Sequence, residues 1–273
     1  MINLGVLGCG NMGQFVIRNL RRPEFRDFSL RIVADLPEKE DVLKELSASQ
    51  GCEYTTDPAL LYEKDLGVLL EAANPEAVRK HVPRLLEAGI SVLSMSVGAF
   101  ADSALLAAAE SAAKQGRSRL LLPTGAIAGL DYLRAAQLVG LEEVQITIIK
   151  TPKGLAGAPY FRDHPVDLFA LQGPCVVFEG SAADAIRGFP ANVNVAVALS
   201  VATIGPEKTR VRVACDPSAS QTKFEIHTRG TTGELSIQLL NIVSPENPRT
   251  SYQACCSALA SLRRFSDPIQ VGS

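Results

Sequence analysis

The sequence predicts an α/β protein in which a doubly wound parallel sheet is followed by an α+β domain with a mainly antiparallel sheet. Two observations carry this prediction. Strand-like apolar runs alternate with helix-like segments up to about residue 118, and the pattern changes after Gly125. Such alternation is typical of a parallel sheet covered by helices. With 273 residues, 47% of them hydrophobic, the chain is long enough for one large or two ordinary domains and can bury a full core. We expect domains at 1–120 and 121–243, with a helix in 244–273 returning to the first domain.

The first strand and helix enclose a glycine motif. An apolar run at residues 2–7 ends in Gly8, Gly10 and Gly13, with Asn11 and Met12 between them, and a helical segment follows at 14–20. A Gly-x-Gly-x-x-Gly pattern between strand and helix predicts a Rossmann dinucleotide-binding domain. The glycines allow the tight turn, the approach of the pyrophosphate, and close packing of helix on strand. The helix N-terminus favours the negative charge of the pyrophosphate. The simpler alternative is a glycine turn that binds nothing.

An acidic residue follows the second strand. The apolar run at 30–34 ends at Asp35, about 20 residues after the glycines, where a carboxylate would bind the adenosine ribose hydroxyls. We therefore expect NAD, with NADP possible because Lys39 lies nearby. The other elements expected here are strands at 68–73, 91–96 and 119–123, a helix from the Asn74 cap toward Gly89, and a helix at 102–115 closed by Gly116.

The region after Gly125 has a different pattern. Val144, Ile146 and Ile148 alternate with polar residues as in a half-buried strand. Residues 151–174 are rich in Pro, Gly and Asp and indicate an irregular loop. The remaining expected elements are helices at 130–139, 182–187, 194–202 and 247–262, and strands at 143–150, 175–179, 210–215, 223–229 and 234–240.

Composition excludes several classes of partner. The net charge is −2 without a long basic run, which argues against nucleic acid and anionic membrane surfaces. No apolar stretch approaches the roughly 20 residues of a membrane span. The six cysteines form no Cys-x-x-Cys pair, so we expect reduced thiols in the cytoplasm and no metal site.

Three segments could carry chemistry. Residues 94–99 follow a predicted parallel strand, at the edge where ligands bind such sheets. Residues 122–131 include Thr124, whose hydroxyl could bind a carboxylate, while Ala126 and Ala128 leave room beside a flat ring. Residues 189–196 include Asn192 and Asn194, which could cap the next helix or present amides to a ligand.

These motifs together resemble the L-aspartate dehydrogenase family. The resemblance rests on Gly-Cys-Gly-Asn-Met-Gly, Thr-Gly-Ala-Ile-Ala-Gly-Leu-Asp, Phe-Glu-Gly-Ser-Ala, Phe-Pro-Ala-Asn-Val-Asn-Val-Ala and Asn-Pro-Arg-Thr-Ser, in this order, up to about residue 262. It implies an NAD(P)-dependent oxidoreductase that interconverts aspartate, or a related amino acid, with its imino or keto acid. It also implies a cytoplasmic homodimer whose product can feed NAD biosynthesis. The implied cofactor contacts are Gly8, Gly10, Asn11, Met12, Gly13, Asp35, Ala73, Ala126, Ala128 and Asn194, and the implied substrate pocket contains Thr124, Asn192, Thr222 and Phe224.

One position departs from the family pattern. The family carries Asn-x-His-Glu-Ile after an Asp-Pro turn, and its histidine is the presumed catalytic residue. Here Thr222 stands at the Asn position and Phe224 at the His position. Phenylalanine cannot transfer a proton, so the catalytic residue is unknown. His164, Lys150 and Lys153 are the candidates that could replace it; His227 should face away from Phe224 because strand side chains alternate. His81, beside Arg79 and Lys80, is expected on a solvated helix face.

Two function classes follow from this departure. The first is a dehydrogenase with an altered substrate or altered proton transfer, which the polar Thr124, Asn192 and Asn194 favour. The second is a nucleotide-binding sensor or scaffold that has lost or changed the catalytic activity. A retained polar substrate pocket discriminates between them.

Overall fold

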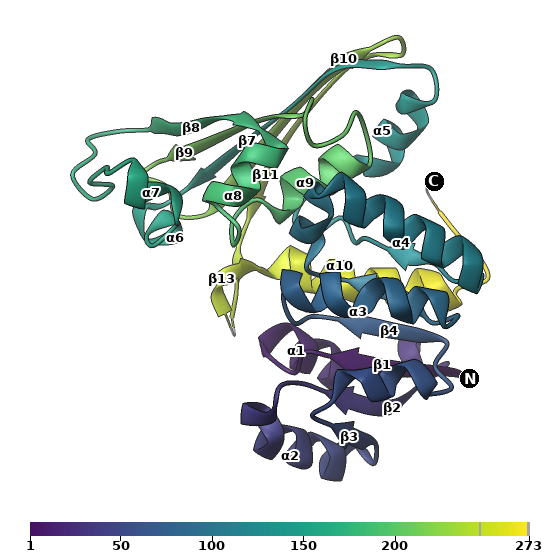
Figure 1. Cartoon of the computed structure of the whole chain (residues 1–273). Coiled ribbons are helices and arrows are strands. Elements are labelled where there is room, and N and C mark those ends of the chain that lie inside the picture. Colours follow the sequence, from purple (N-terminus) through teal and green to yellow (C-terminus); the bar gives the residue numbers. More distant parts are fainter. Residues whose placement is uncertain (246, 272–273) are drawn as a thin grey trace. The chain divides into compact units, whose positions relative to one another are not determined.

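The computed structural model describes residues 1–245 and 247–271, and for 247–250 it describes the backbone alone. The chain divides into two compact units. The first contains Met1–Pro123 and Cys255–Gln270, and the second contains Thr124–Ala254 and Val271. Each unit is described by itself below, with the element labels of Figure 1.

A parallel sheet forms the centre of the first unit (Figure 1). In the described residues its strand order is β3-β2-β1-β4-β5-β6, and every neighbouring pair is parallel. This is the strand order of the dinucleotide-binding Rossmann fold, so the predicted fold class is confirmed. The strands are β1 (Ile2–Leu7), β2 (Phe28–Ala34), β3 (Glu53–Thr55), β4 (Val68–Glu71), β5 (Ser91–Ser94) and β6 (Leu120–Leu121).

Two helices of this unit begin at polar side-chain caps, of which Asn74 is the one that the sequence predicts. The Asn74 side chain accepts a hydrogen bond from the Ala77 amide at 2.9 Å, and Asp102 accepts from Ala104 and Leu105. The α-helices of the Rossmann sequence are α1 (Asn11–Asn19), α2 (Glu40–Gln50), α3 (Pro75–Glu87) and α4 (Ser103–Gly116), with short 3₁₀ helices at Pro23–Phe25, Pro37–Lys39, Pro58–Glu63 and Val97–Ala101.

Gly116 does not close α4 as a residue beyond its end, which the sequence predicts. It is the last helical residue, and Arg117 after it takes the left-handed conformation at φ 52°. A Cβ at Gly116 would lie 1.9 Å from the Leu86 carbonyl oxygen of α3. Glycine is needed here because two helices approach closely.

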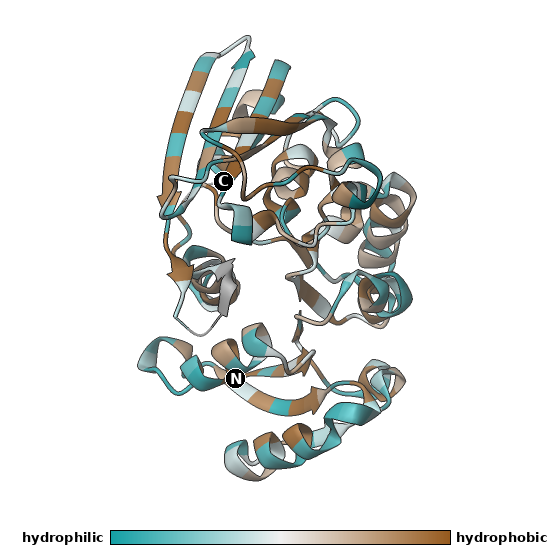
Figure 2. Cartoon of the chain, turned by 90° about the vertical axis from the view of Figure 1, so that its left-hand side faces the viewer, coloured by the Kyte–Doolittle hydropathy of each residue, from teal (hydrophilic) through white to brown (hydrophobic). Residues whose placement is uncertain are grey.

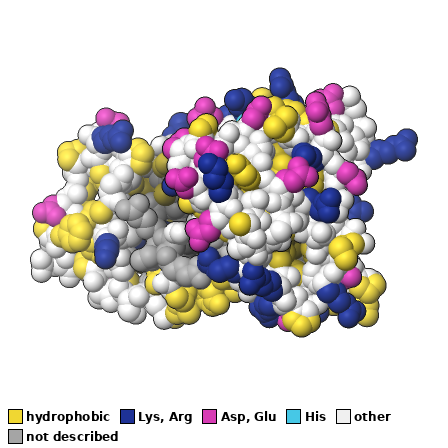
Figure 3. All heavy atoms as spheres, turned by 90° about the horizontal axis from the view of Figure 1, so that it is seen from below, with side chains coloured by type: hydrophobic (Ala, Val, Ile, Leu, Met, Phe, Trp, Pro, Cys, Tyr) yellow, Lys and Arg dark blue, Asp and Glu magenta, His cyan; other side chains and the backbone are white. Residues whose placement is uncertain are grey.

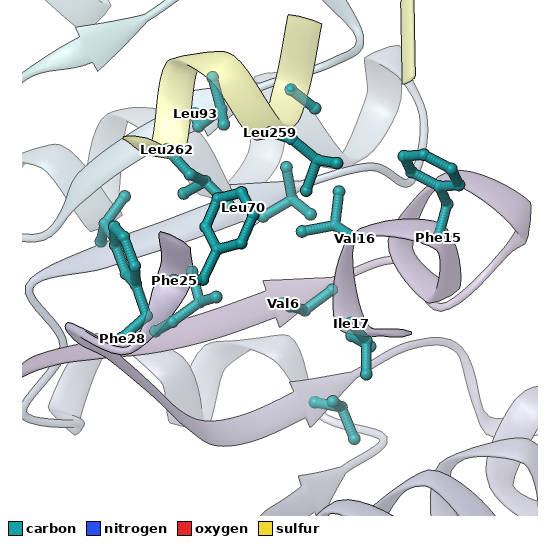
Figure 4. Packing of buried hydrophobic residues seen from close by; sticks show 14 of the residues in the cluster. Val6, Phe15, Val16, Ile17, Phe25, Phe28, Leu70, Leu93, Leu259 and Leu262 are labelled. Carbon is teal, nitrogen blue, oxygen red and sulfur yellow. The ribbon is translucent and has the colours of Figure 1, made fainter. Parts of the chain in front are cut away.

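The C-terminal helix α10 (Tyr252–Ser266) completes the core of the first unit. Its buried residues Cys255, Ala258, Leu259 and Leu262 join a hydrophobic cluster built from β1, β4, β5 and α1. Figure 4 shows Leu259 and Leu262 directed toward side chains of that cluster. The helix begins later than expected, because residues 247–251 form strand β13, which pairs with β12 (Val243–Ser244). Pro248 explains this difference, since the residue before a proline is biased to extended backbone.

A mixed sheet forms the second unit. Its order is β11-β10-β7-β9-β8 in the part of the chain that the structure describes. The β7–β9 pair is parallel and the other three pairs are antiparallel, which confirms the mainly antiparallel prediction. Hydrophobic and hydrophilic residues alternate along its long strands in Figure 2. The strands are β7 (Leu141–Lys150), β8 (Cys175–Ser181), β9 (Arg210–Cys215), β10 (Thr222–Gly230) and β11 (Gly233–Asn241).

Helices pack with this sheet and interrupt the expected loop. The segment 151–174 contains two single-turn helices, although the sequence predicts irregular structure throughout. The α-helices of the second unit are α5 (Leu130–Gln137), α6 (Pro152–Leu155), α7 (Tyr160–Asp163), α8 (Ala182–Gly188) and α9 (Asn194–Val201).

Candidate functional site

The parallel strands of the first unit end side by side. Leu7 is paired with Ala34 on one side and with Glu71 on the other, and Glu71 is paired with Ser94. The segments that follow β1, β2, β4 and β5 therefore share the carboxyl edge of the sheet. Ligands of open α/β sheets bind at this edge.

The glycine motif is shaped by two different constraints. Gly8 has φ +97°, and a Cβ there would lie 2.5 Å from the backbone of Ala73 after β4. A Cβ at Gly13 would lie 2.0 Å from the Gly8 carbonyl oxygen. Close backbone packing thus explains both residues. Gly10 is different, because its Cβ would meet no described atom within 4 Å. The space beside Gly10, before the first residue of α1, fits an approaching pyrophosphate.

Asp35 is tied to the same loop. Its Oδ2 accepts a hydrogen bond from the Cys9 amide at 2.7 Å, and its Oδ1 accepts from the Leu36 amide at 2.8 Å. Each carboxylate oxygen retains acceptor capacity after one such bond. The carboxylate is therefore fixed beside the glycine loop and can still bind ribose hydroxyls.

Glu71, which was not predicted from the sequence as a site residue, organises two of the edge segments. Among the described contacts, Oε1 accepts from the Ala73 amide at 2.9 Å and the Ser96 hydroxyl at 2.8 Å. Oε2 accepts from the Ser94 hydroxyl at 2.6 Å and the Ser96 amide at 3.2 Å. Burial raises the pKa of Glu71, and these hydrogen bonds oppose that rise. A charged residue that ends the apolar run Val-Leu-Leu-Glu was the signal that could have identified it.

Replacing Glu71 with glutamine should destabilise the first unit. Each carboxylate oxygen accepts one backbone amide, so the glutamine NH₂ would face an N–H donor in either orientation. We expect a loss of about 1–3 kcal/mol in the free energy of unfolding, the usual cost of an unpaired buried donor. Urea denaturation of Glu71→Gln and wild type measures it. A variant as stable as wild type would contradict this account of Glu71.

In the second unit, the segment after Pro123 lies against β11. The Asn241 side chain donates to the Ala126 carbonyl oxygen at 2.6 Å, and a Cβ at Gly129 would lie 2.5 Å from Ile237. Asn241 is the strand partner of Thr222. The structure therefore brings the 124–129 segment next to the start of β10, with Ala126 buried and the Thr124 and Ala128 side chains exposed.

Asn192 does not cap α9, because the residue before the helix is Val193 and the Asn192 side chain binds elsewhere. Its Oδ1 accepts a hydrogen bond from Lys150 Nζ at 2.8 Å. Lys150 is the last residue of β7, and Asn194 is the first residue of α9. The Lys150 contact thus joins the end of β7 to the start of α9.

Phe224 is buried, 3% exposed, on the face of β10 that also holds Ile226 and Thr228. Its strand partners are Ile148 and Leu239. His227 occupies the other face, where its Nδ1 lies 3.1 Å from the Ser236 hydroxyl. The prediction that His227 points away from Phe224 agrees with this alternation.

The other two histidines differ in their surroundings. His164 is exposed, and its ring stacks on Tyr160 with centroids 4.2 Å apart. The expectation of a solvated His81 is wrong. His81 is 6% exposed, and its Nδ1 lies 2.5 Å from the Tyr62 hydroxyl. Burial lowers the pKa of His81, so this side of α3 packs inward while Arg79 and Lys80 face out.

The remaining features of the described residues concern metal ions, membrane spans, cysteines, surface charge and a separate cavity. No group of three or more His, Cys, Asp or Glu residues there is placed to hold a metal ion. No described helix has the length and apolarity that crossing a membrane requires. None of the described cysteines takes part in a disulfide. Basic and acidic side chains are interspersed on the face in Figure 3. A cavity of about 800 Å³ at the other end of β7, lined by residues such as Glu143, Lys208 and Arg229, contains none of the candidate residues.

Comparison with known proteins places the chain in a family. Residues 131–265 match the family described as aspartate dehydrogenase, C-terminal, and residues 8–123 match homoserine dehydrogenase, NAD binding domain. The chain is 38% identical to L-aspartate dehydrogenase of Methanosarcina mazei and 39% identical to that of Methanosarcina acetivorans, over the full length of both chains in each case. The chain belongs to the L-aspartate dehydrogenase family.

Solved structures support the fold of this family member. Aspartate dehydrogenase from Thermotoga maritima matches all of both chains with a TM-score of 0.74 at 24% identity. Scyllo-inositol dehydrogenase from Lactobacillus casei, solved with bound NAD(H) and scyllo-inositol, matches with a TM-score of 0.56 at 15% identity, covering 100% of this chain and 91% of the other. At these identities the likeness concerns the fold alone.

Proposed function

We propose that this member of the L-aspartate dehydrogenase family is an NAD(P)-dependent oxidoreductase that interconverts L-aspartate with iminosuccinate, and hence with oxaloacetate and ammonia. The observation that carries the proposal is full-length identity of 38–39% to L-aspartate dehydrogenases. The glycine motif, the open space at Gly10 and the oriented Asp35 carboxylate support it from the structure.

The first unit offers the larger part of the cofactor contacts. The amides at the start of α1, in the Gly8–Gly13 loop with Asn11 and Met12, would bind the pyrophosphate. Asp35 would bind the adenosine ribose, and Ala73 lies in the segment held by Glu71. In the second unit, Ala126, Ala128 and Asn194 are the proposed contacts. When bound, the nicotinamide supplies hydride transfer.

The second unit also offers the proposed substrate groups. The Thr124 hydroxyl, the Asn192 amide and the Thr222 hydroxyl can bind carboxylates or orient a polar group. Phe224 contributes an apolar surface, and we infer that it stands where the family carries its histidine. Its burial keeps water from this part of the sheet.

An activity assay tests the proposal directly. The purified chain is mixed with NADH, oxaloacetate and ammonia, and with NAD and L-aspartate, while absorbance at the nicotinamide band is followed. We expect turnover in both directions and none when ammonia is omitted from the first mixture. A panel of other keto acids is the control for specificity. If one of them is turned over faster than oxaloacetate, the corresponding amino acid is the substrate in place of aspartate.

Phe224 is the observation that favours a second candidate function. A chain that binds the cofactor but lacks the family's proton donor could be a nucleotide sensor or scaffold. Tight NADH binding by calorimetry, without turnover of any amino-acid and keto-acid pair, would favour that function.

We further propose that the protein works as a cytoplasmic homodimer; light scattering after size-exclusion chromatography checks the dimer.

Asp35 should make NAD(H) the preferred cofactor. Its carboxylate would repel a 2′-phosphate, and the residues that follow, Leu-Pro-Glu-Lys-Glu, contain no arginine to bind one. We expect Asp35→Ser to weaken NADH binding by about tenfold, or about 1.4 kcal/mol. The difference in affinity between NADH and NADPH should become smaller. Fluorescence titration of both cofactors measures this. Tighter NADPH binding by the wild type would contradict it.

A further inference from the structure

Lys150 combines features that its role in the fold does not require. It ends β7 with its side chain partly accessible, and Asn192 Oδ1 accepts a hydrogen bond from its Nζ at 2.8 Å. Among the described residues it takes part in no ion pair. Lysines that are largely removed from water are ordinarily paired with a charge, so Lys150, which is desolvated and held by a neutral amide, is a candidate for chemistry.

Lys150 also lies on the face of the sheet that carries Phe224. Phe224 is the strand partner of Ile148, and Lys150 lies two residues further along the same strand. Side chains two residues apart share a face. A residue and its diagonal neighbour on the adjacent strand are about 7–8 Å apart, within the reach of a long side chain. The lysine can thus reach the surroundings of the position where the family carries its histidine.

The surroundings of Lys150 make its proton easier to lose than that of a lysine in water. Removal from water lowers its pKa to about 8, because the charged form loses hydration without gaining a counter-ion. A lysine with such a pKa can act as an acid or a base near neutral pH. The neutral amine can donate one hydrogen to Asn192 Oδ1 and still keep its lone pair for a proton.

We propose that Lys150 is the proton-transfer residue of this active site, with Asn192 as the residue that positions it, in place of the histidine that Phe224 has replaced. The proposal rests on the proposed oxidation of an amino acid to its imine, and it concerns the hydrolysis of that imine. His164, which is exposed and stacked on Tyr160, is not required.

Lys150 gives up and regains one proton in each hydrolysis. Neutral Lys150 Nζ takes a proton from a water molecule whose oxygen bonds to the carbon of the protonated imine, and the C=N π electrons move to nitrogen. The carbinolamine and a Lys150 ammonium result. The ammonium returns its proton to the carbinolamine nitrogen. The C–N bond then breaks with its electrons on nitrogen, the C=O bond forms, and the hydroxyl proton leaves with the departing ammonia. One water is consumed, keto acid and ammonium are released, and Lys150 is neutral again.

Lysine variants test the proposal in the full chain. We expect Lys150→Met to lower kcat for aspartate oxidation by about 10²–10⁴-fold, the usual contribution of an acid–base group. The wild-type kcat should rise with pH, with its midpoint near pH 8. This rise should be absent in Lys150→Arg, because arginine cannot lose its proton. Lys153→Met, which removes an exposed lysine three residues away, is the matched control and should keep the wild-type profile.

Chemical rescue separates a catalytic from a structural role. Lys150→Ala should regain activity when ethylamine is added, with rates that depend on the pKa of the added amine; a lysine that only supports the fold would give no such dependence. Asn192→Ala should lower kcat and shift the pH at which kcat rises, while Asn192→Gln should recover part of the lost kcat. Loss of activity in Lys153→Met, or unchanged kcat in Lys150→Met, would overturn the proposal.

A measurement without turnover keeps the two proposals distinct. In protein labelled with ¹³C at lysine Cε, the resonance absent from Lys150→Met should titrate near pH 8 and should shift when malate and NADH are added together. If the wild type turns over no amino acid and this resonance still shifts, the aspartate activity fails and the binding role of Lys150 stands. Titration near 10.5, or no response to malate with NADH, overturns the role assigned to Lys150.

Discussion

Phe224→His is expected to raise aspartate dehydrogenase activity. The phenyl ring at this position cannot exchange a proton, whereas an imidazole on the same face of β10 could. The gain should not exceed the roughly 10²–10⁴-fold that one acid–base group contributes. Steady-state kinetics in both directions measures it. Because Phe224 is 3% exposed and its partners Ile148 and Leu239 are apolar, the variant should also lose about 1–3 kcal/mol of stability through an incompletely paired imidazole.

Two further variants test whether the imidazole itself causes the gain in activity. Phe224→Leu keeps the site apolar and should not raise activity. Thr222→Asn combined with Phe224→His introduces the two residues that we infer for the family at these positions, and it should exceed the single variant, since an amide can orient the imidazole better than the hydroxyl. High activity of the unmodified protein that His164→Ala or His227→Ala abolishes would contradict the assignment, because another histidine would then carry the proton.

The Lys150 proposal predicts how the two substitutions combine. If the new imidazole takes over proton transfer, Lys150→Met should cost much less in the Phe224→His background than in the wild type. Residues that serve one step are strongly non-additive in this way. Equal losses in the two backgrounds would mean that the introduced imidazole and Lys150 act independently.

Gly13→Ala and Gly10→Ala should each have a large effect, the first on stability and the second on NADH affinity. A Cβ at Gly13 would lie 2.0 Å from the Gly8 carbonyl oxygen, so the loop and α1 must move apart. We expect a loss of about 1–3 kcal/mol of stability or more, as for other overpacked sites. A Cβ at Gly10 meets nothing within 4 Å, and the φ of −73° suits alanine. That variant should keep its stability and lose about tenfold or more in NADH affinity, about 1.4 kcal/mol.

Thermal unfolding and calorimetric titration of both variants separate these effects. Gly51→Ala offers a control for backbone strain away from the loop, because Gly51 has φ +68° and open space around it. It should lose some stability and bind NADH normally. If Gly10→Ala binds NADH as tightly as wild type, the space beside Gly10 is not the pyrophosphate site.

The fold could be predicted because its signals are local. The glycine spacing, the caps at Asn74 and Asp102 and the alternation in β7 each depend on neighbours in the sequence, and each element formed where such a signal was present. Pro248 shows the limit of this reasoning. The sequence favoured a helix from residue 247, but the residue before proline takes extended backbone and pairs with β12.

The sequence offered candidate site residues, but it could not show which of their polar groups meet. That Phe224 faces the core and His227 faces away follows from strand alternation alone. Which polar groups meet is different, because partners far apart in the chain decide it. Glu71 is held by Ser94 and Ser96, His81 is buried against Tyr62, and Lys150 finds Asn192 across 42 residues.

The sequence by itself determined the parallel sheet, the mainly antiparallel second sheet, the glycine loop and the acidic residue after β2, because each depends on local spacing and residue type. Only the tertiary structure decided that Gly13 is needed for packing while Gly10 leaves open space, and that Lys150 loses its water without gaining a counter-ion. The physical reason is that clearance and desolvation depend on every atom that surrounds a group, and most of those atoms belong to segments distant in the chain.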